Sequence, residues 1–434
     1  MSQVDALDLL RRLVRFETVN PPGAERECVA WVEGLLRDAG IETRIVAKDP
    51  ERPNLVARLP GRGQSPPLLL QGHVDVVPVA DQQWTHAPFA AEEADGFLWG
   101  RGTLDMKGGV AMMIAAVLRA NEEGIAPPGD VLLCVLSDEE AGGGCGAQFL
   151  VDEHPELFEG VRYALGEFGG FTRHLGGKRF APISVGEKQV CWLKGRVTGP
   201  GGHASLPPRG GTMAKLGEVL ARLDRGRLPV RVTPIARRFV DTLADELGPA
   251  RSLALRTLLR PRLTDRALDL LGDQGELLDP MLHNTVSVTV VHAGDKINVI
   301  PSEVTLQLDA RLVPGVSAEE ACAEIQALAG PDLELDVERS DSSSPADPDL
   351  GLWDVLAGAL TDADAGVVPV PYLMPAVTDG RFFARLGIQT YGFTPMQLAE
   401  GFEFQKLIHA ADERIPLDAP EFGTQAMVRV LERF

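Results

Sequence analysis

The sequence predicts an α/β protein in which a mainly parallel sheet with flanking helices is interrupted by a smaller α+β domain. The length of 434 residues exceeds one ordinary hydrophobic core, so two domains are expected. Short apolar runs alternate with helical patterns through the first 185 residues, which is typical of a parallel sheet. After residue 185 the pattern changes to amphipathic strands and helices, as in a small antiparallel sheet with helices on one face.

The elements of the first part follow one another in strand and helix alternation. Helical periodicity covers 4–15, 25–39 and 108–123, and strand-type runs cover 41–46, 53–58, 67–71, 131–136 and 161–166. Sites in such folds collect at the carboxyl ends of the strands. We therefore expect function at the ends of the runs that lead into His73 and into Glu139.

The second part has its own order of elements. Strands are expected at 188–197, 284–294, 302–313 and 332–340, and helices at 211–224 and 317–330. The stretch 226–283 is an additional helical excursion, and the turn-rich segment 340–351 leads back to the first domain. The predicted layout is a catalytic domain in two parts, 1–185 and 341–434, with an inserted domain at 186–340.

Composition excludes several classes of protein. The chain is 44% hydrophobic and 24% charged, which is the profile of a globular protein, and its net charge of −20 argues against a nucleic-acid partner. No stretch approaches the ~20 uncharged residues of a membrane span, and the N-terminal segment lacks the apolar core of a signal peptide. Five cysteines without paired spacing indicate reduced thiols and a cytoplasmic location.

His73 and Asp75 stand in the middle of the apolar run "LLLQGHVDVVPV", residues 68–79. Residues two apart in a strand point to the same side, so the imidazole and the carboxylate are expected to lie close together. This pattern suits a metal ligand oriented by a carboxylate. A core histidine paired with a neighbouring acid is the alternative that this run alone leaves open.

Other strand and loop ends also present single ligand-type residues. Asp105 lies in the glycine-rich "WGRGTLDMKGG", Glu139 and Glu140 follow a buried strand, Glu167 ends another, and His409 lies in "LIHAADERIP". Each alone is compatible with a solvated turn or a helix cap. Together they suit zinc or a similar divalent ion. Such a carboxylate-rich set can hold two ions that share and deprotonate one water, while a further carboxylate takes the proton.

The ordered motifs resemble those of a known family. "GHVDVVP", "GRGTLDMKGG", "SDEEAGG", "GEFGG", "GPGGHAS", "KINVIP", "DARLVPG" and "HAADERIP" are similar to the dinuclear zinc peptidases of family M20, which include aminoacylase-1, acetylornithine deacetylase, succinyl-diaminopimelate desuccinylase and the glutamate carboxypeptidases. The resemblance runs from about residue 5 to 430. It implies a zinc-exopeptidase-like sheet and a ferredoxin-like dimerisation or lid domain.

The resemblance also implies roles for individual residues. His73 and Glu167 would bind one ion, Glu140 and His409 the other, and Asp105 would bridge the two. Two Zn²⁺ ions are expected, with Co²⁺ as a possible substitute. In the same family pattern, Asp75 would orient His73, and Glu139 would be the general base.

Four further residues are implied in substrate handling. His203 would stabilise the oxyanion, commonly in the active site of a partner subunit, so a homodimer through the inserted domain is expected. Asn298 and Arg311 match positions that grip a substrate carboxylate, a task that suits a guanidinium fork. Arg381, in "VTDGRFFAR", is a second carboxylate candidate, and a surface arginine is its alternative.

The expected activity is hydrolysis of an amide in an N-acyl amino acid or in a small peptide with a free C-terminal carboxylate. In the resembling family, Glu at position 167 goes with deacylases and carboxypeptidases, whereas Asp goes with aminopeptidases and dipeptidases. A dipeptidase or aminopeptidase of the same family is the nearer alternative. A non-catalytic binding relative is the more distant one.

Overall fold

The computed structural model describes residues 5–341 and 344–434, so parts of the expected first helix and of the turn-rich segment 340–351 lie outside the described residues. The chain forms two compact units. One comprises Met1–Val185, Asp349–Pro371 and Thr378–Phe434, and the other comprises Gly186–Pro348 and Tyr372–Val377. The second part of the first unit thus begins at Asp349, whereas the sequence predicts that it begins at 341. Residues 372–377 belong to the second unit again.

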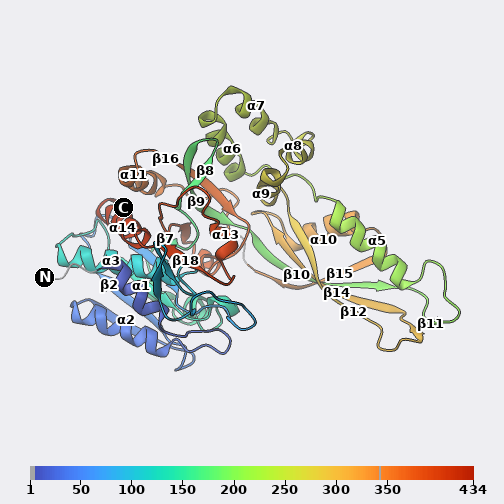
Figure 1. Cartoon of the computed structure of the whole chain (residues 1–434), viewed down its shortest axis with the longest axis horizontal. Helices are drawn as coiled ribbons and strands as arrows, with labels where there is room; N and C mark the ends of the chain where they lie inside the picture. The colour runs from blue at the N-terminus through green and yellow to red at the C-terminus, as the bar shows by residue number, and fades with distance from the viewer. Residues whose placement is uncertain (1–4, 342–343) are drawn as a thin grey trace. The chain divides into compact units, whose positions relative to one another are not determined.

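The first unit is built on a large mixed sheet that is parallel in its centre (Figure 1). The parallel pairs are β6 with β3, β3 with β7, and β7 with β17. The order across the sheet is β1 (Glu42–Val46), β2 (Asn54–Leu59), β6 (Val131–Leu136), β3 (Leu68–His73), β7 (Tyr163–Gly166), β17 (Gln389–Gly392), β9 (Lys178–Glu187) and β16 (Val367–Met374), with β8 (Arg173–Leu175) paired to β9. This architecture confirms the predicted fold class.

Helices cover both faces of the central strands, which explains why β3 and β6 are buried along their whole length. α3 (Lys107–Glu122) packs on one face, and α1 (Ala6–Val14) and α14 (Ala419–Arg433) pack against α3. On the other face, side chains such as Leu69 and Leu132 form a core with α4 (Ala147–Glu153) and α12 (Gly380–Phe383).

Shorter elements complete the first unit. β4 (Glu92–Ala94), β5 (Phe97–Trp99) and β18 (Arg414–Pro416) form a three-stranded sheet. The remaining helices are α2 (Arg26–Asp38), α11 (Trp353–Ala363) and α13 (Phe404–Leu407), with short 3-10 turns at Glu139–Ala141, Pro155–Phe158 and Ala384–Leu386.

The second unit contains a four-stranded antiparallel sheet in the order β12 (Thr285–Ala293), β14 (Glu303–Leu312), β10 (Gln189–Thr198) and β15 (Leu333–Ser340). Alternate residues of β14, from Val304 to Leu312, are buried, as the period of two requires. α5 (Thr212–Arg225) packs on this sheet, and α10 (Ala318–Ala329) packs on β15 and α5.

Two further parts belong to the second unit. The helical excursion consists of α6 (Pro234–Glu246), α7 (Pro249–Thr257), α8 (Thr264–Leu271) and α9 (Asp273–Leu282). β11 (Gly202–His203) and β13 (Val299–Ile300) form a two-stranded ribbon.

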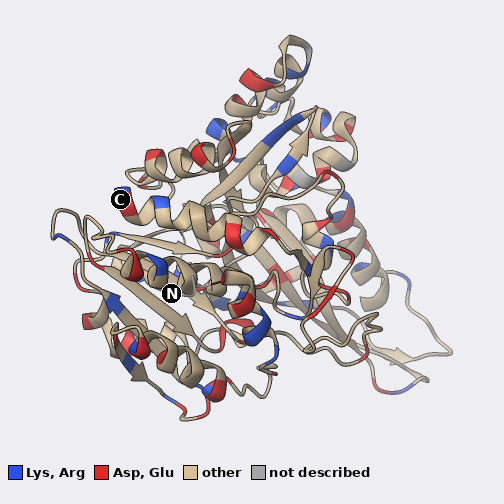
Figure 2. Cartoon of the chain, turned by 60° about the vertical axis from the view of Figure 1, so that its left-hand side comes forward, with Lys and Arg blue, Asp and Glu red and all other residues tan. Residues whose placement is uncertain are grey.

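Charge and helix length agree with the composition. Acidic residues are distributed over the ribbons and interspersed with basic ones (Figure 2), in a chain of net charge −20. Across 5–341 and 344–434, none of the helices combines the length and the apolar character that a transmembrane span requires.

Candidate metal centre

Three neighbouring strand ends bring ligand-type side chains to one edge of the large sheet. β3 ends at His73, β6 leads into Glu139 and Glu140, and β7 leads into Glu167. Because β6, β3 and β7 are adjacent and parallel, their carboxyl ends meet at the same edge. The sheet therefore brings four of the predicted site residues to one edge, with Glu139 and Glu140 on the short turn that follows β6.

Two loops supply the remaining ligand-type residues. Asp105 lies two residues before the start of α3, and His409 lies two residues after the end of α13. His409 has a φ of 60°, in the left-handed region that few histidines adopt. The surrounding contacts must therefore hold this residue in place.

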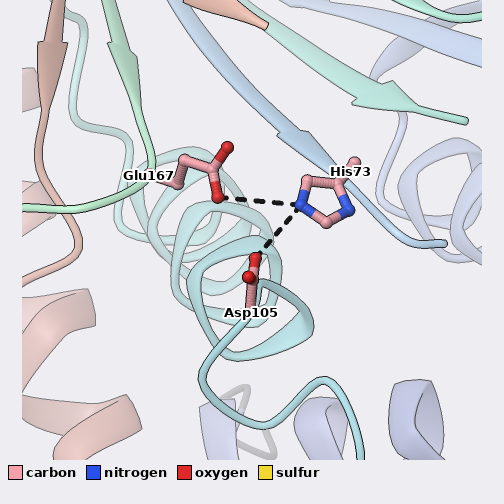
Figure 3. Close-up of side chains that lie close together, drawn as sticks. All are labelled: His73, Asp105 and Glu167. Atoms are coloured by element: carbon pink, nitrogen blue, oxygen red, sulfur yellow. Dashed lines mark ion pairs between the residues drawn. The ribbon is translucent and has the colours of Figure 1, made fainter. Parts of the chain in front are cut away.

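The side chains form two groups that share Asp105. In the first group, His73 Nε2 lies 3.3 Å from Asp105 Oδ1 and 3.7 Å from Glu167 Oε2 (Figure 3). In the second group, His409 Nε2 lies 3.2 Å from Asp105 Oδ2 and 3.3 Å from Glu140 Oε2. Asp105 thus presents one carboxylate oxygen to each group, as a bridging ligand would.

Hydrogen bonding leaves room for cations between these atoms. His73 Nδ1 lies 3.0 Å from the Asp75 carbonyl oxygen, which can only accept, so Nδ1 carries a proton, and in the neutral ring that a metal binds Nε2 presents a lone pair. That lone pair faces carboxylate oxygens, which are also acceptors. Within the described residues, His73 Nε2, Asp105 Oδ1 and Glu140 Oε1 are buried without a hydrogen-bond partner. A divalent ion in each group would satisfy these acceptors, so the residues fit two metal ions.

Electrostatics also favour bound cations. Burial raises the pKa of Glu167 to about 8 and, with the negative charge of Glu167, raises the pKa of Glu139 well above its ordinary value. Hydrogen bonds to Asp105 and Glu140 raise the pKa of His409 to about 10. In Asp105, burial opposes ionisation, but the two imidazoles hold its pKa below the usual range. The acids thus repel one another until positive charge is placed among them.

Asp75 has more contacts than the sequence suggested. Its carboxylate is fully buried, and Oδ1 lies 3.4 Å from His73 Nδ1. It also accepts hydrogen bonds from the backbone N–H groups of Glu139, at 3.1 Å, and Glu140, at 3.0 Å, and from Asn20 Nδ2 at 2.8 Å. One carboxylate therefore fixes both His73 and the turn that carries the two glutamates.

Glu139 lies beside the two ligand groups and belongs to neither. Its backbone is fixed by Asp75, and its Oε1 lies 3.8 Å from Arg381 Nη1. Arg381 is buried and stacks over the Phe382 ring at 4.5 Å, so the alternative of a surface arginine is wrong. The structure therefore brings together His73, Asp75, Asp105, Glu139, Glu140, Glu167, Arg381 and His409.

The other three predicted residues lie in the second unit. His203 and Asn298 are neighbours on the β11–β13 ribbon, since the Ala204 N–H donates to the Asn298 carbonyl at 3.1 Å. Arg311 lies near the far end of β14, eight residues from Glu303, or about 27 Å along an extended strand. Its guanidinium is held by Asp309 at 2.7 and 2.9 Å. Within this unit the structure does not bring Arg311 to His203.

Sequence reasoning missed several residues around the site. Asn20 contacts Asp75, and Asp379 is a buried carboxylate whose pKa is raised by burial to about 7. Arg101 and Glu413 form a buried ion pair next to the ligands. Asn20 carries no sequence signal, whereas Arg101 and Glu413 lie inside motifs already associated with Asp105 and His409.

Comparison with known proteins gives a consistent result. The model of peptidase family M20/M25/M40 matches residues 69–433. A probable carboxypeptidase S-like 2 of Dictyostelium discoideum is 29% identical over 81% of this chain and 68% of its own length. Aminoacylase-1 of Sus scrofa is 27% identical over 94% of this chain and 90% of its own length.

A solved structure shows the same fold. The M20 family metallo-carboxypeptidase Sso-CP2 of Sulfolobus solfataricus superimposes with a TM-score of 0.69, covering 100% of this chain and 99% of that one at 15% identity. Since the family model spans most of the chain, the family and the metal-dependent hydrolase class are both shown. The chain belongs to peptidase family M20.

Proposed function

We propose that this protein hydrolyses the amide bond of N-acyl amino acids or of small peptides with a free C-terminal carboxylate. The observation that carries the proposal is the pair of ligand groups joined by Asp105, with the unligated carboxylate of Glu139 beside them. The names of the relatives, a carboxypeptidase-like protein and an aminoacylase, support this substrate class.

His73 and Glu167 would hold one ion, Glu140 and His409 the other, and Asp105 both. We infer that the ions are Zn²⁺, with Co²⁺ as a substitute, because both accept imidazole and carboxylate ligands. When bound, such ions lower the pKa of a water molecule and polarise the scissile carbonyl.

Glu139 is the general base in this proposal. Its side chain is free of both ligand groups, and its backbone N–H is fixed by Asp75. Glu139 would take a proton from the attacking water and donate it to the leaving amine, which is general base and then general acid catalysis. Asp75 would keep His73 and Glu139 in fixed positions relative to each other, because it contacts both.

Arg381 is our first candidate for the substrate carboxylate. Its buried guanidinium lies 3.8 Å from Glu139, so a carboxylate gripped there would place the neighbouring amide near the base. Asn298 lies beside His203 and is a second contact. The guanidinium of Arg311 is paired with Asp309, so substrate binding there requires that this pair be released or shared.

His203 would donate a hydrogen bond to the oxyanion. Its Nδ1 accepts from the Ser205 N–H at 3.2 Å, so the neutral ring carries its proton on Nε2. This tautomer presents an N–H donor from an exposed position. We infer that His203 serves the site of a second subunit, which implies a homodimer through the second unit. We also infer that the protein is cytoplasmic. Light scattering of the purified chain tests the dimer.

The activity is tested with three substrates that share one side chain, after addition of Zn²⁺ or Co²⁺. They are an N-acetyl amino acid, its C-terminal amide and an unblocked dipeptide. The proposal predicts turnover of the N-acetyl amino acid and weak turnover of its amide, because the amide lacks the carboxylate. Preference for the dipeptide would make the protein a dipeptidase or aminopeptidase. Two bound ions without turnover of any panel member would favour a binding relative.

A further inference from the structure

A buried ion pair lies next to the proposed metal ligands and belongs to neither ligand group. Arg101 Nη1 donates to Glu413 Oε2 at 2.7 Å, and both side chains are at most 1% exposed. The pair connects two loops that are more than 300 residues apart in the sequence. One loop carries Asp105, and the other carries His409.

Glu413 holds the loop of the bridging ligand. Its Oε1 accepts from the backbone N–H groups of Leu104, at 2.8 Å, and of Asp105 itself, at 3.2 Å. Its Oε2 accepts from the Gly102 N–H at 3.1 Å. Three backbone N–H groups within four residues thus donate to one buried carboxylate, which restrains this part of the loop.

Arg101 holds the loop of His409. Its Nη1 donates to the Ala410 carbonyl at 3.1 Å, and its Nη2 donates to the His409 carbonyl at 3.2 Å. Gln82 completes the arrangement, because it accepts from Arg101 Nη2 at 2.9 Å and donates to the His409 carbonyl, also at 2.9 Å. The guanidinium lies over the Trp84 ring at 5.1 Å. These contacts account for the left-handed backbone of His409.

The two ligand groups depend on this pair to different degrees. His73 and Glu167 come from the ends of adjacent parallel strands, and His73 is also held by Asp75. His409 comes from a loop, and its side chain is 49% exposed. Loss of the Arg101 contacts would therefore move His409 while the strand-borne ligands stay in place.

We propose that Arg101, anchored by Glu413, is a positioning residue that sets the metal affinity of the group formed by Asp105, Glu140 and His409. It acts by fixing the His409 backbone relative to Asp105. The inference rests on the ligand assignment in the proposed function. Groups that orient metal ligands in this way change metal affinity 10- to 100-fold when they are altered.

The test is a titration of metal-free protein with Zn²⁺ in competition with a chromophoric chelator, repeated with Co²⁺ and followed by its absorption spectrum. Arg101→Lys keeps the charge but loses the fork that reaches Glu413, His409 and Ala410 together. One of two binding steps is expected to weaken about 10- to 100-fold, with the other changed less than about threefold. His409→Ala identifies which step belongs to His409.

Gln82→Ala is a second variant in case Arg101→Lys does not fold, because Gln82 lies at the edge of the arrangement. It is expected to weaken the same step about three- to tenfold and to leave the other step unchanged, as one of two hydrogen bonds to the His409 carbonyl is lost. Glu421→Gln is the matched control, since Arg119 and Glu421 form a similar pair, at 2.8 and 2.9 Å, on α3 and α14. The control should leave both steps unchanged.

The outcomes separate this inference from the proposed function. Equal weakening of both steps, no weakening, or the same change in Glu421→Gln would overturn the inference. A wild-type chain that binds fewer than two ions would overturn the ligand assignment and this inference with it. Two bound ions and a selective effect of Arg101→Lys, without hydrolysis of any N-acyl amino acid, would uphold the inference and refute the proposed substrate class.

Discussion

Asp75→Asn is the substitution whose effect the structure allows to be worked out most fully. The carboxylate accepts from Glu139 N–H through Oδ1, and from Glu140 N–H and Asn20 Nδ2 through Oδ2. An asparagine has one acceptor oxygen, and its NH₂ group must face at least one of these donors. The least costly orientation keeps the two contacts of Oδ2 and leaves the part-buried Glu139 N–H without an acceptor.

The expected loss of stability follows from the number of hydrogen bonds that the substitution removes. One donor left without an acceptor costs about 1–3 kcal/mol when it is shielded from water, and the remaining bonds lose the strengthening that a charged acceptor provides. We expect the metal-free Asp75→Asn variant to lose about 2–4 kcal/mol of unfolding free energy. Displacement of His73 and Glu139 should also weaken metal binding about 10- to 100-fold and lower kcat/KM about 100-fold at saturating metal.

Urea unfolding, chelator competition and steady-state kinetics measure the three effects. Asp130→Asn is the control, because Asp130 also accepts from a backbone N–H, that of Gly61, and pairs with Arg58 away from the site. The control should change neither metal affinity nor kcat/KM. If Asp75→Asn retained wild-type metal affinity and turnover within about threefold, the positioning role of Asp75 would be refuted.

Three other predictions test separate parts of the structure. Burial lowers the pKa of Lys188 from 10.5 to about 7, so the unfolded chain binds the extra proton between these values and stability rises with pH across that window. Unfolding of wild type and Lys188→Met from pH 7 to 10 should therefore diverge by up to about 1.4 kcal/mol per pH unit, and parallel curves would contradict the assignment. Arg381→Lys should raise KM for an N-acyl amino acid about tenfold with a smaller change in kcat, because a lysine lacks the bidentate fork; unchanged kinetics would exclude this arginine from substrate binding. Removal of metal by a chelator should lower the Tm, by the equivalent of about 3 kcal/mol for each ion that is present at 100 times its Kd, and an unchanged Tm would argue against ions bound to the folded state.

Much of the site could be predicted because it depends on strand ends. The apolar runs before His73, Glu139 and Glu167 are short, β-type and bounded by glycine, so their pairing in one sheet follows from local sequence. Neighbouring parallel strands then place their ends together whatever the loops do. The same pattern of short strands explains why the fold class could be predicted correctly.

The remaining features depend on contacts that local sequence does not encode. Asn20 contacts Asp75 from 55 residues away in the sequence, and Arg101 pairs with Glu413 across more than 300 residues. Likewise, no local sequence pattern predicts that residues 372–377 belong to the second unit.

The state of Arg311 is a different case. Asp309 and Arg311 are two apart in β14 and so point to the same side of the sheet, where the guanidinium and the carboxylate pair. A guanidinium with a carboxylate beside it is less available to a substrate, and the resemblance to the family motif does not reflect that pairing.

The most direct test of the central claim combines metal analysis and turnover in Glu139→Gln. The substitution removes the proposed base and leaves both ligand groups intact. We predict two metal ions per chain, as in wild type, and a fall in kcat of at least about 100-fold, the lower range for loss of a general base. Two bound ions with near-normal turnover would contradict the role of Glu139, and loss of the ions would contradict its separation from the ligands.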